Sequence, residues 1–237
     1  MTHGPLVATW AGRCIFSAYK ISTTSHLRAA ITNRNESAQM PLPTSLCVYC
    51  GSSSGKHPKY VEQARAFGTE MARRGIALIY GGGKVGLMGT VADAVMAGGG
   101  KVVGVIPRQL VEREVAHPGL TEMHVVETMH QRKTRMYELS DAFVALPGGF
   151  GTMDEMFEML TWAQLGLHTY PCGFLDVRSY YAPLRTMMDH MVSEGFVRPE
   201  QRESVWFGDS AEQLFDWMAH YQGSYTPKWI DSSSVEA

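Results

Sequence analysis

From Leu46 onward, short apolar runs rich in β-branched residues alternate with longer stretches of helical periodicity. This alternation is typical of βα units, in which successive strands lie parallel in one sheet and helices cover it. The apolar runs are LCVYC, IALIYG, KVVGVIP, MHVVE, AFVALP and CGFLDV. We therefore expect an α/β fold, a Rossmann-like three-layer sandwich with a central parallel sheet flanked by helices.

The stretches between these runs predict helices. The expected ranges are 59–74, 87–97, 131–139, 153–165 and 181–194. Gly75 and Gly195 stand where helices end and where a left-handed backbone conformation favours glycine. A last amphipathic stretch, SAEQLFDWMAHY, predicts a helix with Ser210 as its N-cap and Glu212 near its positive end.

The first residues differ from the rest of the chain. Residues 1–43 are rich in hydroxyl groups and carry four basic side chains against one acidic side chain. Two interpretations remain open for 1–43, a disordered extension or a mitochondrial transit peptide. We expect residues 44–225 to form the Rossmann-like domain and residues 226–237 to form a loose C-terminal tail.

The composition of the chain limits the kinds of molecule that we expect it to bind. The net charge of −2 provides no broad basic field, so we expect a small-molecule substrate and no nucleic acid. No apolar run approaches the ~20 residues that cross a bilayer, so no membrane partner is expected. Four cysteines are too few and too scattered for a disulfide scaffold. This predicts a cytoplasmic protein, or a mitochondrial one if residues 1–43 are a transit peptide.

Cys47 and Cys50 form a CxxC pattern inside the first predicted strand. Residues three apart in a strand point to opposite faces, whereas a redox pair occupies a turn and the helix that follows it. A zinc site would also need a second pair of ligands. We interpret Cys47 and Cys50 as two core thiols, and we expect no metal site.

Three glycine-rich stretches follow predicted strands: GSSSG at 51–55, GGGKVGLMG at 81–89 and PGGFGT at 147–152. Parallel sheets bind ligands outside the carboxyl ends of their strands, where loops meet helix N-termini. Three such stretches in register predict a ligand that bears phosphate. The candidates for this phosphate site are Ser52, Gly82, Gly83, Gly86, Met88 and Gly89.

Two other phosphate motifs fit less well. Gly81, Gly83 and Gly86 satisfy GxGxxG, but a dinucleotide site needs an acidic residue after the following strand. That strand ends instead in Pro107 and Arg108. A P-loop is also disfavoured, because the lysine of the first glycine stretch is followed by histidine instead of serine or threonine.

The stretch PGGFGTMDE, residues 147–155, allows two interpretations. Thr152 and Glu155 are spaced as a helix capping box. Alternatively, the main chain from Gly148 to Thr152 holds a phosphate and Glu155, one turn deeper, faces the sugar of the same ligand. Arg132, in the preceding stretch MHQRKTRM, is suited to oppose Glu155 and to grip a phosphate or a ribose hydroxyl.

In this order and spacing, GGGKVGLMG, MHQRKTRM and PGGFGTMDE resemble the LONELY GUY family, whose motif is PGGxGTxxE. The resemblance runs from about Leu46 to Trp217. It implies hydrolysis of the N-glycosidic bond of N6-substituted adenosine 5'-monophosphates to a free base and ribose 5-phosphate. It also implies a homodimer and no cofactor. Members were long labelled possible lysine decarboxylases, but no lysine here suggests a pyridoxal phosphate site.

Carried over by position, the resemblance makes Arg132 and Glu155 the catalytic pair. Gln131 departs from many members, which have glutamate beside the catalytic arginine. Glu114 matches a binding position in a loop that varies among members. The expected substrate-binding residues are Glu114, Lys133, Gly148, Gly149, Phe150, Gly151, Thr152, Met153, Asp154 and Thr161.

Several alternatives stay open. A nucleotide sensor or scaffold could use the same cradle without turnover, and a broad purine 5'-monophosphate nucleosidase would not need an N6 substituent. Met88, Met129 and Trp162 are candidates for a base pocket or for ordinary core. His130 and His168 have no identifiable partner in the sequence, so we interpret both as structural.

Overall fold

The structure is a computed structural model that describes residues 42–111 and 116–223. Within these residues, seven strands form one sheet with the order β4-β3-β2-β1-β5-β6-β7. The strands are β1 (Ser45–Tyr49), β2 (Ala77–Tyr80), β3 (Val102–Pro107), β4 (Glu122–Val126), β5 (Phe143–Ala145), β6 (Cys172–Leu175) and β7 (Val205–Gly208). The helices are α1 (Pro58–Arg73), α2 (Gly86–Ala97), α3 (Met129–Glu138), α4 (Phe150–Gln164), α5 (Ala182–Ser193), α6 (Pro199–Glu203) and α7 (Ala211–His220).

Every strand pair in the sheet is parallel. The chain builds outward from β1 through β2, β3 and β4, then crosses to the other side of β1 and adds β5, β6 and β7. The strand order therefore reverses between β1 and β5. Such a reversal opens a crevice at the carboxyl ends of the two strands, which is the usual ligand site of this kind of sheet.

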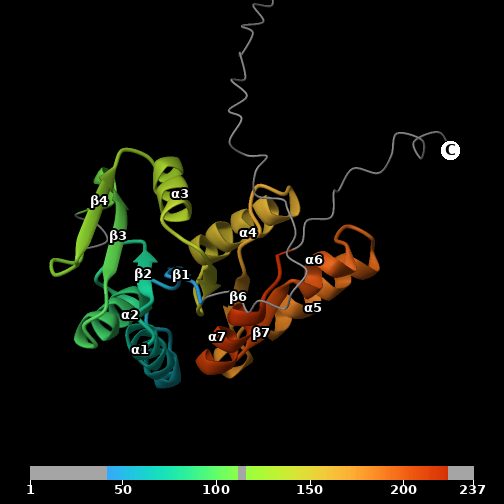
Figure 1. Ribbon diagram of the computed structural model, residues 1–237, viewed down its shortest axis with the longest axis horizontal. Helices are drawn as coiled ribbons and strands as arrows, with labels where there is room; N and C mark the ends of the chain where they lie inside the picture. Colours follow the sequence, from blue (N-terminus) through green and yellow to red (C-terminus); the bar gives the residue numbers. More distant parts are fainter. Residues whose placement is uncertain (1–41, 112–115, 224–237) are drawn as a thin grey trace, which may run out of the picture. The chain divides into compact units, whose positions relative to one another are not determined.

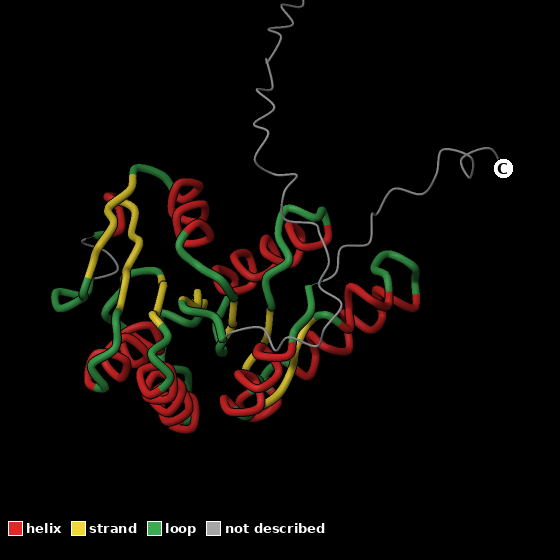
Figure 2. The backbone as a smooth tube through the Cα atoms, in the orientation of Figure 1, coloured by secondary structure: helices red, strands yellow, loops and turns green. Residues whose placement is uncertain are grey.

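Helices cover both faces of the sheet, which makes three layers. Leu46 and Val48 of β1 face a core shared with α1, α2 and α7, whereas Cys47 and Tyr49 face a core shared with α3, α4 and α5. Figure 1 shows α1 and α2 on one side of the strands and α3 and α4 on the other, and Figure 2 shows the strands between the helices. The predicted α/β three-layer fold is confirmed.

Burial on both faces explains why the sequence predicted the central strands so well. All six predicted strands are present, and Ser210 caps α7 by accepting a hydrogen bond from the Gln213 amide at 3.3 Å. Gly75 and Gly195 adopt the expected left-handed conformation, with φ of 70° and 77°. Cys47 and Cys50 are free thiols in the two opposite cores, as predicted.

Strand β7 and helix α6 were not predicted, and both are short. Strand β7 has four residues, of which only Val205 is buried, so it lacks a buried apolar run. Helix α6 has five residues, which is too few to show a helical period. Helix α4 also begins at Phe150, three residues before the predicted start.

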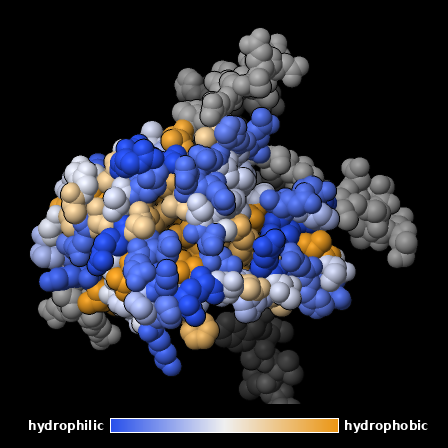
Figure 3. Space-filling model, turned by 90° about the horizontal axis from the view of Figure 1, so that it is seen from below, coloured by the Kyte–Doolittle hydropathy of each residue, from blue (hydrophilic) through white to orange (hydrophobic). Residues whose placement is uncertain are grey.

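The predicted extension and tail lie almost entirely outside the described residues, so their boundaries stay predictions. Among the described residues, no helix is long and apolar enough to cross a membrane. Seen from below, hydrophilic side chains surround a middle region where hydrophobic side chains reach the surface (Figure 3).

Candidate active site

The three glycine-rich loops meet at the carboxyl edge of the sheet. They follow β1, β2 and β5, which are neighbours in the strand order. The Gly51 amide donates a hydrogen bond to the Pro147 carbonyl at 3.1 Å, and the Leu87 amide donates one to the Gly51 carbonyl at 3.0 Å. The first loop therefore joins the other two at the strand-order reversal.

Two glycines let these loops approach so closely. Gly86 has a φ of 64°, and a Cβ there would collide with the main chain of Ser52. A Cβ on Gly148 would collide with the side chain of Thr152 and lie 2.9 Å from the Gly51 nitrogen. Any larger residue at either position would push the loops apart.

Helix α4 starts directly at the third loop, and the capping-box interpretation of Thr152 and Glu155 is wrong. The N-cap is Gly149, which has no side chain to cap the helix. Thr152 lies inside the first turn, where it is buried against Gly148. The first amides of α4 therefore have no side-chain cap, which suits them to bind an anion at this edge.

The capping box lies instead on α3, where the sequence departs from many family members. The Thr128 hydroxyl accepts a hydrogen bond from the Gln131 amide at 3.1 Å, and the Gln131 side chain accepts one from the Thr128 amide at 3.3 Å. Gln131 is exposed. Glutamine and glutamate can both complete a capping box. The difference between Gln131 and the glutamate of many family members therefore affects the start of α3.

Arg132 reaches from α3 to the carboxyl ends of two strands. Its side chain is buried, with the residue only 5% exposed. Nε donates to the Val105 carbonyl of β3 at 3.1 Å, and Nη2 donates to the Gly81 carbonyl after β2 at 2.9 Å. A Cβ on Gly81 would collide with Nη2. Two of the five guanidinium N–H donors thus serve the main chain and fix the position of the charge.

Glu155 lies in the second turn of α4 and is partly buried. Burial raises the pKa of the Cys47 thiol, the negative charge of Glu155 raises it further, and the positive charge of Arg132 lowers it. Burial and the charge of Glu155 also raise the pKa of Cys50. The charges of Arg132 and Glu155 thus both act on the Cys47 thiol of β1, and that of Glu155 also acts on Cys50 just after this strand.

Lys133 does not reach the glycine loops through any described contact. Its Nζ lies 3.3 Å from Asp154 Oδ2 and 3.3 Å from Glu158 Oε1, both on α4. Partial burial alone would lower the pKa of Lys133, but hydrogen bonds to Glu158 and Asp154 outweigh burial and raise it. Lys133 and Asp154 were both expected to bind substrate, and here they bind each other.

The other expected substrate residues are more scattered. Phe150 is 96% exposed at the start of α4, and Met153 is partly buried. Glu114 lies outside the described residues. The exposed Thr161 donates its hydroxyl to the Phe157 carbonyl at 2.8 Å and is not among the residues at the glycine loops.

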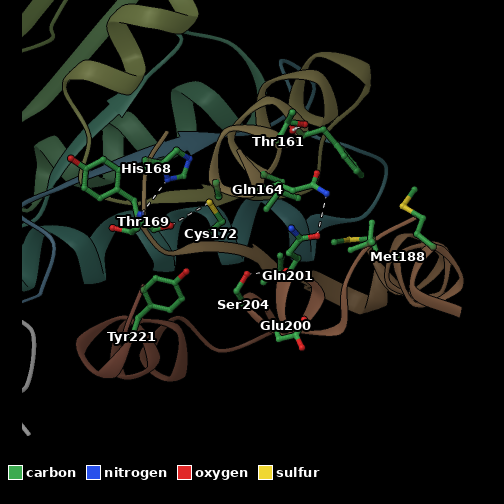
Figure 4. Close-up of a pocket in the computed structure, with 17 residues that line it drawn as sticks. Thr161, Gln164, His168, Thr169, Cys172, Met188, Glu200, Gln201, Ser204 and Tyr221 are labelled. Atoms are coloured by element: carbon green, nitrogen blue, oxygen red, sulfur yellow. Dashed lines mark hydrogen bonds between the residues drawn. The ribbon is translucent and has the colours of Figure 1, made fainter. Parts of the chain in front are cut away.

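Thr161 lines a cavity of about 260 Å³ at the opposite edge of the sheet. The cavity touches Cys172 and Val205, the first residues of β6 and β7. Figure 4 shows Gln164 and Gln201 meeting across it, with Nε2 of Gln164 donating to Oε1 of Gln201 at 3.1 Å. This cavity is therefore separate from the glycine loops.

The remaining candidates have different surroundings. Met88 is buried in the core, and Trp162 packs edge to face on Tyr137 with centroids 5.0 Å apart. Met129 contacts Arg132, with Nη1 at 3.8 Å from its sulfur. His168 is structural as predicted, because its Nε2 lies 2.9 Å from the Met159 carbonyl and its Nδ1 accepts the Tyr170 amide at 3.1 Å.

Two tyrosines that sequence reasoning missed, and that no motif marks, support the third glycine loop. The hydroxyl of Tyr180 donates to the Gly148 carbonyl at 2.5 Å, and that of Tyr181 donates to the Leu146 carbonyl at 2.7 Å. Arg178 and Ser179 just before them have positive φ angles of 58° and 56°. Non-glycine residues in this conformation mark local strain, which is frequent beside functional sites.

Among the residues that the structure describes, no three His, Cys, Asp or Glu side chains are grouped to hold a metal ion.

Comparison with known proteins identifies the family. Residues 88–218 match the family described as "Possible lysine decarboxylase". The chain is 47% identical over 180 residues to cytokinin riboside 5'-monophosphate phosphoribohydrolase LOG7 of Arabidopsis thaliana. This alignment covers 76% of this chain and 83% of that protein. It is 51% identical over 166 residues to cytokinin riboside 5'-monophosphate phosphoribohydrolase of Rhodococcoides fascians, and the alignment covers 70% of this chain and 84% of that protein.

Solved structures share the fold at low sequence identity. The molybdenum cofactor binding protein of Rippkaea orientalis has a TM-score of 0.55 at 20% identity and covers 76% of this chain and 96% of that one. The molybdenum cofactor carrier protein of Chlamydomonas reinhardtii has a TM-score of 0.54 at 17% identity, covering 73% and 93%. These similarities concern the fold alone. The family match and the relatives at 47% and 51% identity show that the chain belongs to the LONELY GUY family of cytokinin riboside 5'-monophosphate phosphoribohydrolases.

Proposed function

We propose that this protein hydrolyses the N-glycosidic bond of N6-substituted adenosine 5'-monophosphates and releases the free base and ribose 5-phosphate. Family membership supports the reaction. The observation that carries the assignment of residues is that Arg132 binds the Gly81 carbonyl at the second glycine loop, while Glu155 lies in the second turn of the helix that starts at the third loop.

The phosphate is assigned to the third glycine loop. The uncapped amides at the start of α4 point out of the helix, and the helix dipole adds positive potential there. Gly148 and Gly149 bring no side chain between this main chain and an anion. A demand for the 5'-phosphate follows, because a riboside would leave these amides without an acceptor.

Glu155 is assigned to the sugar. As the bond between C1' and the base breaks, its electron pair moves to the base and positive charge develops on the ribose ring. A carboxylate near C1' stabilises that charge and orients the water that adds to C1'. The proton of this water ends on the departing base.

Arg132 is assigned an electrostatic role. Its guanidinium stays charged, since its pKa lies above ~12, so it does not act as the proton donor. Two main-chain carbonyls fix it before substrate arrives, so no reorganisation is needed during the reaction. The charge there suits the 5'-phosphate or the departing base.

We also propose a homodimer formed through the outer face of α4. Phe150, Phe157, Thr161 and Leu165 fall on one face at 3.6 residues per turn, and Phe150, Thr161 and Leu165 are exposed. Thr161 is about 120° around the helix from Glu155, so the two do not face one ligand in a single subunit. Across a dimer, Thr161 would serve the partner's site.

The test measures free base released from N6-isopentenyl-AMP, AMP and the matching riboside. Glu155→Gln keeps the size of the side chain and removes its charge, and we expect kcat to fall about a hundredfold or more. Glu138→Gln, which alters an exposed carboxylate on α3 that pairs with Arg135, is the matched control and should keep full activity.

Each alternative has its own outcome. Base released from the monophosphates but not from the riboside supports the phosphoribohydrolase. Equal rates with AMP and the N6-substituted nucleotide would indicate a broad purine monophosphate nucleosidase. Tight nucleotide binding without any release of base would contradict the enzyme and indicate a sensor.

A further inference from the structure

Lys133 links the two helices that carry the proposed catalytic pair. It follows Arg132 directly on α3, and its ammonium group lies 3.3 Å from carboxylate oxygens of both Asp154 and Glu158 on α4. Asp154 and Glu158 are four residues apart, so they are neighbours on one helix face. Glu155 lies between them in the chain, which places the link beside the proposed catalytic carboxylate.

The ion pair between Lys133 and Glu158 is largely shielded from water. The side chains of Lys133 and Glu158 are 18% and 21% exposed, whereas that of Asp154 is 64% exposed. Oε2 of Glu158 is buried and makes no hydrogen bond among the described residues. A buried carboxylate oxygen without such a bond depends on a nearby cation for compensation, and Lys133 supplies it.

A second contact joins α3 and α4 further along. Tyr137 packs edge to face on Trp162, near the C-terminal parts of both helices. In the sequence of each helix, Lys133, Asp154 and Glu158 lie closer to Arg132 and Glu155 than Tyr137 and Trp162 do. The Lys133 link is therefore better placed than the aromatic contact to set the spacing between the two proposed catalytic groups.

We propose that Lys133 is a positioning residue, which bridges α3 to Asp154 and Glu158 and thereby holds Arg132 and Glu155 in register. This inference rests on the proposed function. It differs from the role that family resemblance implies for Lys133, which is direct contact with the substrate.

The test is a double-mutant cycle in the full-length protein, with kcat and KM measured separately for N6-isopentenyl-AMP. The variants are Lys133→Met, Glu158→Gln and both together. We expect Lys133→Met to lower kcat about tenfold or more while KM changes less than about threefold, because misplaced groups lose transition-state contacts. The double variant should be no slower than the slower single variant, because both changes break one link.

Two controls separate positioning from general damage. Arg135→Met removes another cation of α3, which pairs with Glu138 on the same helix at 3.1 Å, and it should leave kcat unchanged. Lys133→Arg keeps the charge and should restore most of the lost kcat. Thermal unfolding of each variant shows whether the fold persists. If Lys133→Met does not fold, the same link is tested by measuring kcat and KM for Asp154→Asn and Glu158→Gln, which alter its carboxylates on α4.

The outcomes separate this inference from the proposed function. A large rise in KM with kcat unchanged, or independent effects of Lys133 and Glu158, would show direct substrate contact and overturn the positioning role alone. Full activity of Lys133→Met would overturn it too. A wild-type protein that releases no base from any monophosphate would contradict the proposed function itself, and the inference with it.

Discussion

Individual residues at the site are held by the main chain as much as by other side chains. The guanidinium of Arg132 binds the carbonyls of Gly81 and Val105, and the absence of a side chain at Gly81 makes room for Nη2. Tyr180 and Tyr181 likewise bind main-chain carbonyls at the third glycine loop. Main-chain carbonyls in or just after the strands therefore hold these side chains in place.

We expect Gly81→Ala to lower kcat about a hundredfold, because the new methyl group occupies the position of Nη2 and displaces the guanidinium. Gly119→Ala is the matched control, since a Cβ there would make only an ordinary contact of 3.8 Å with His117. Steady-state kinetics and thermal unfolding check both. Full activity of Gly81→Ala would show that the position of Arg132 does not matter for catalysis.

At the scale of elements, Asp141 fastens the start of β1 to the turn before β5. One carboxylate oxygen accepts hydrogen bonds from the amides and hydroxyls of Thr44 and Ser45, at 2.6–3.2 Å. Burial would raise the pKa of Asp141, but these hydrogen bonds outweigh burial and lower it. The two strands that border the ligand crevice are thus tied together at their amino ends.

This depressed pKa makes the contribution of Asp141 depend on pH. The ionised carboxylate stabilises the fold above the pKa of about 4 that aspartate has in an unfolded chain, and the gain is lost as pH falls through the lower folded pKa. We expect Asp141→Asn to reduce the free energy of unfolding by about 1 kcal/mol at pH 7, and by less at pH 3. Urea denaturation at both pH values checks this, with the exposed Asp209→Asn as control. An equal loss at both values would contradict it.

The sequence predicted the central strands because they are buried on both faces and therefore read as continuous apolar runs. It also predicted that three glycine loops would share one edge, since the carboxyl ends of parallel strands do so. It could not place the start of α4, because Thr152 and Glu155 have the spacing of a capping box whether or not they form one. Nor could it show that Lys133 binds α4, since contacts between helices depend on how they pack.

At the scale of the whole molecule, the outer face of α4 is the surface that a second copy would cover. Phe150 and Leu165 expose apolar area at the two ends of this face, with Thr161 between them. Apolar side chains aligned on one helix face are typical of association surfaces.

We expect Leu165→Glu to shift the protein toward monomers, because it places a charge on the proposed interface. Sedimentation velocity over a range of concentrations measures this shift, and activity should fall as dimers are lost. Phe196→Glu is the control, since Phe196 is also a highly exposed apolar residue but lies after α5. Dimers that survive Leu165→Glu and dissociate with Phe196→Glu would place the interface elsewhere.

The bond from the Gly51 amide to the Pro147 carbonyl joins loops that are far apart in the chain. Closing such a long separation costs entropy that only the nearly complete sheet offsets, so we expect this edge to form late when the protein refolds. Partly folded molecules can then have helices and a collapsed core but no working site. After dilution from denaturant, the release of base should therefore recover more slowly than the helical circular dichroism signal. Enzymatic turnover then reports the rate of the last step of folding.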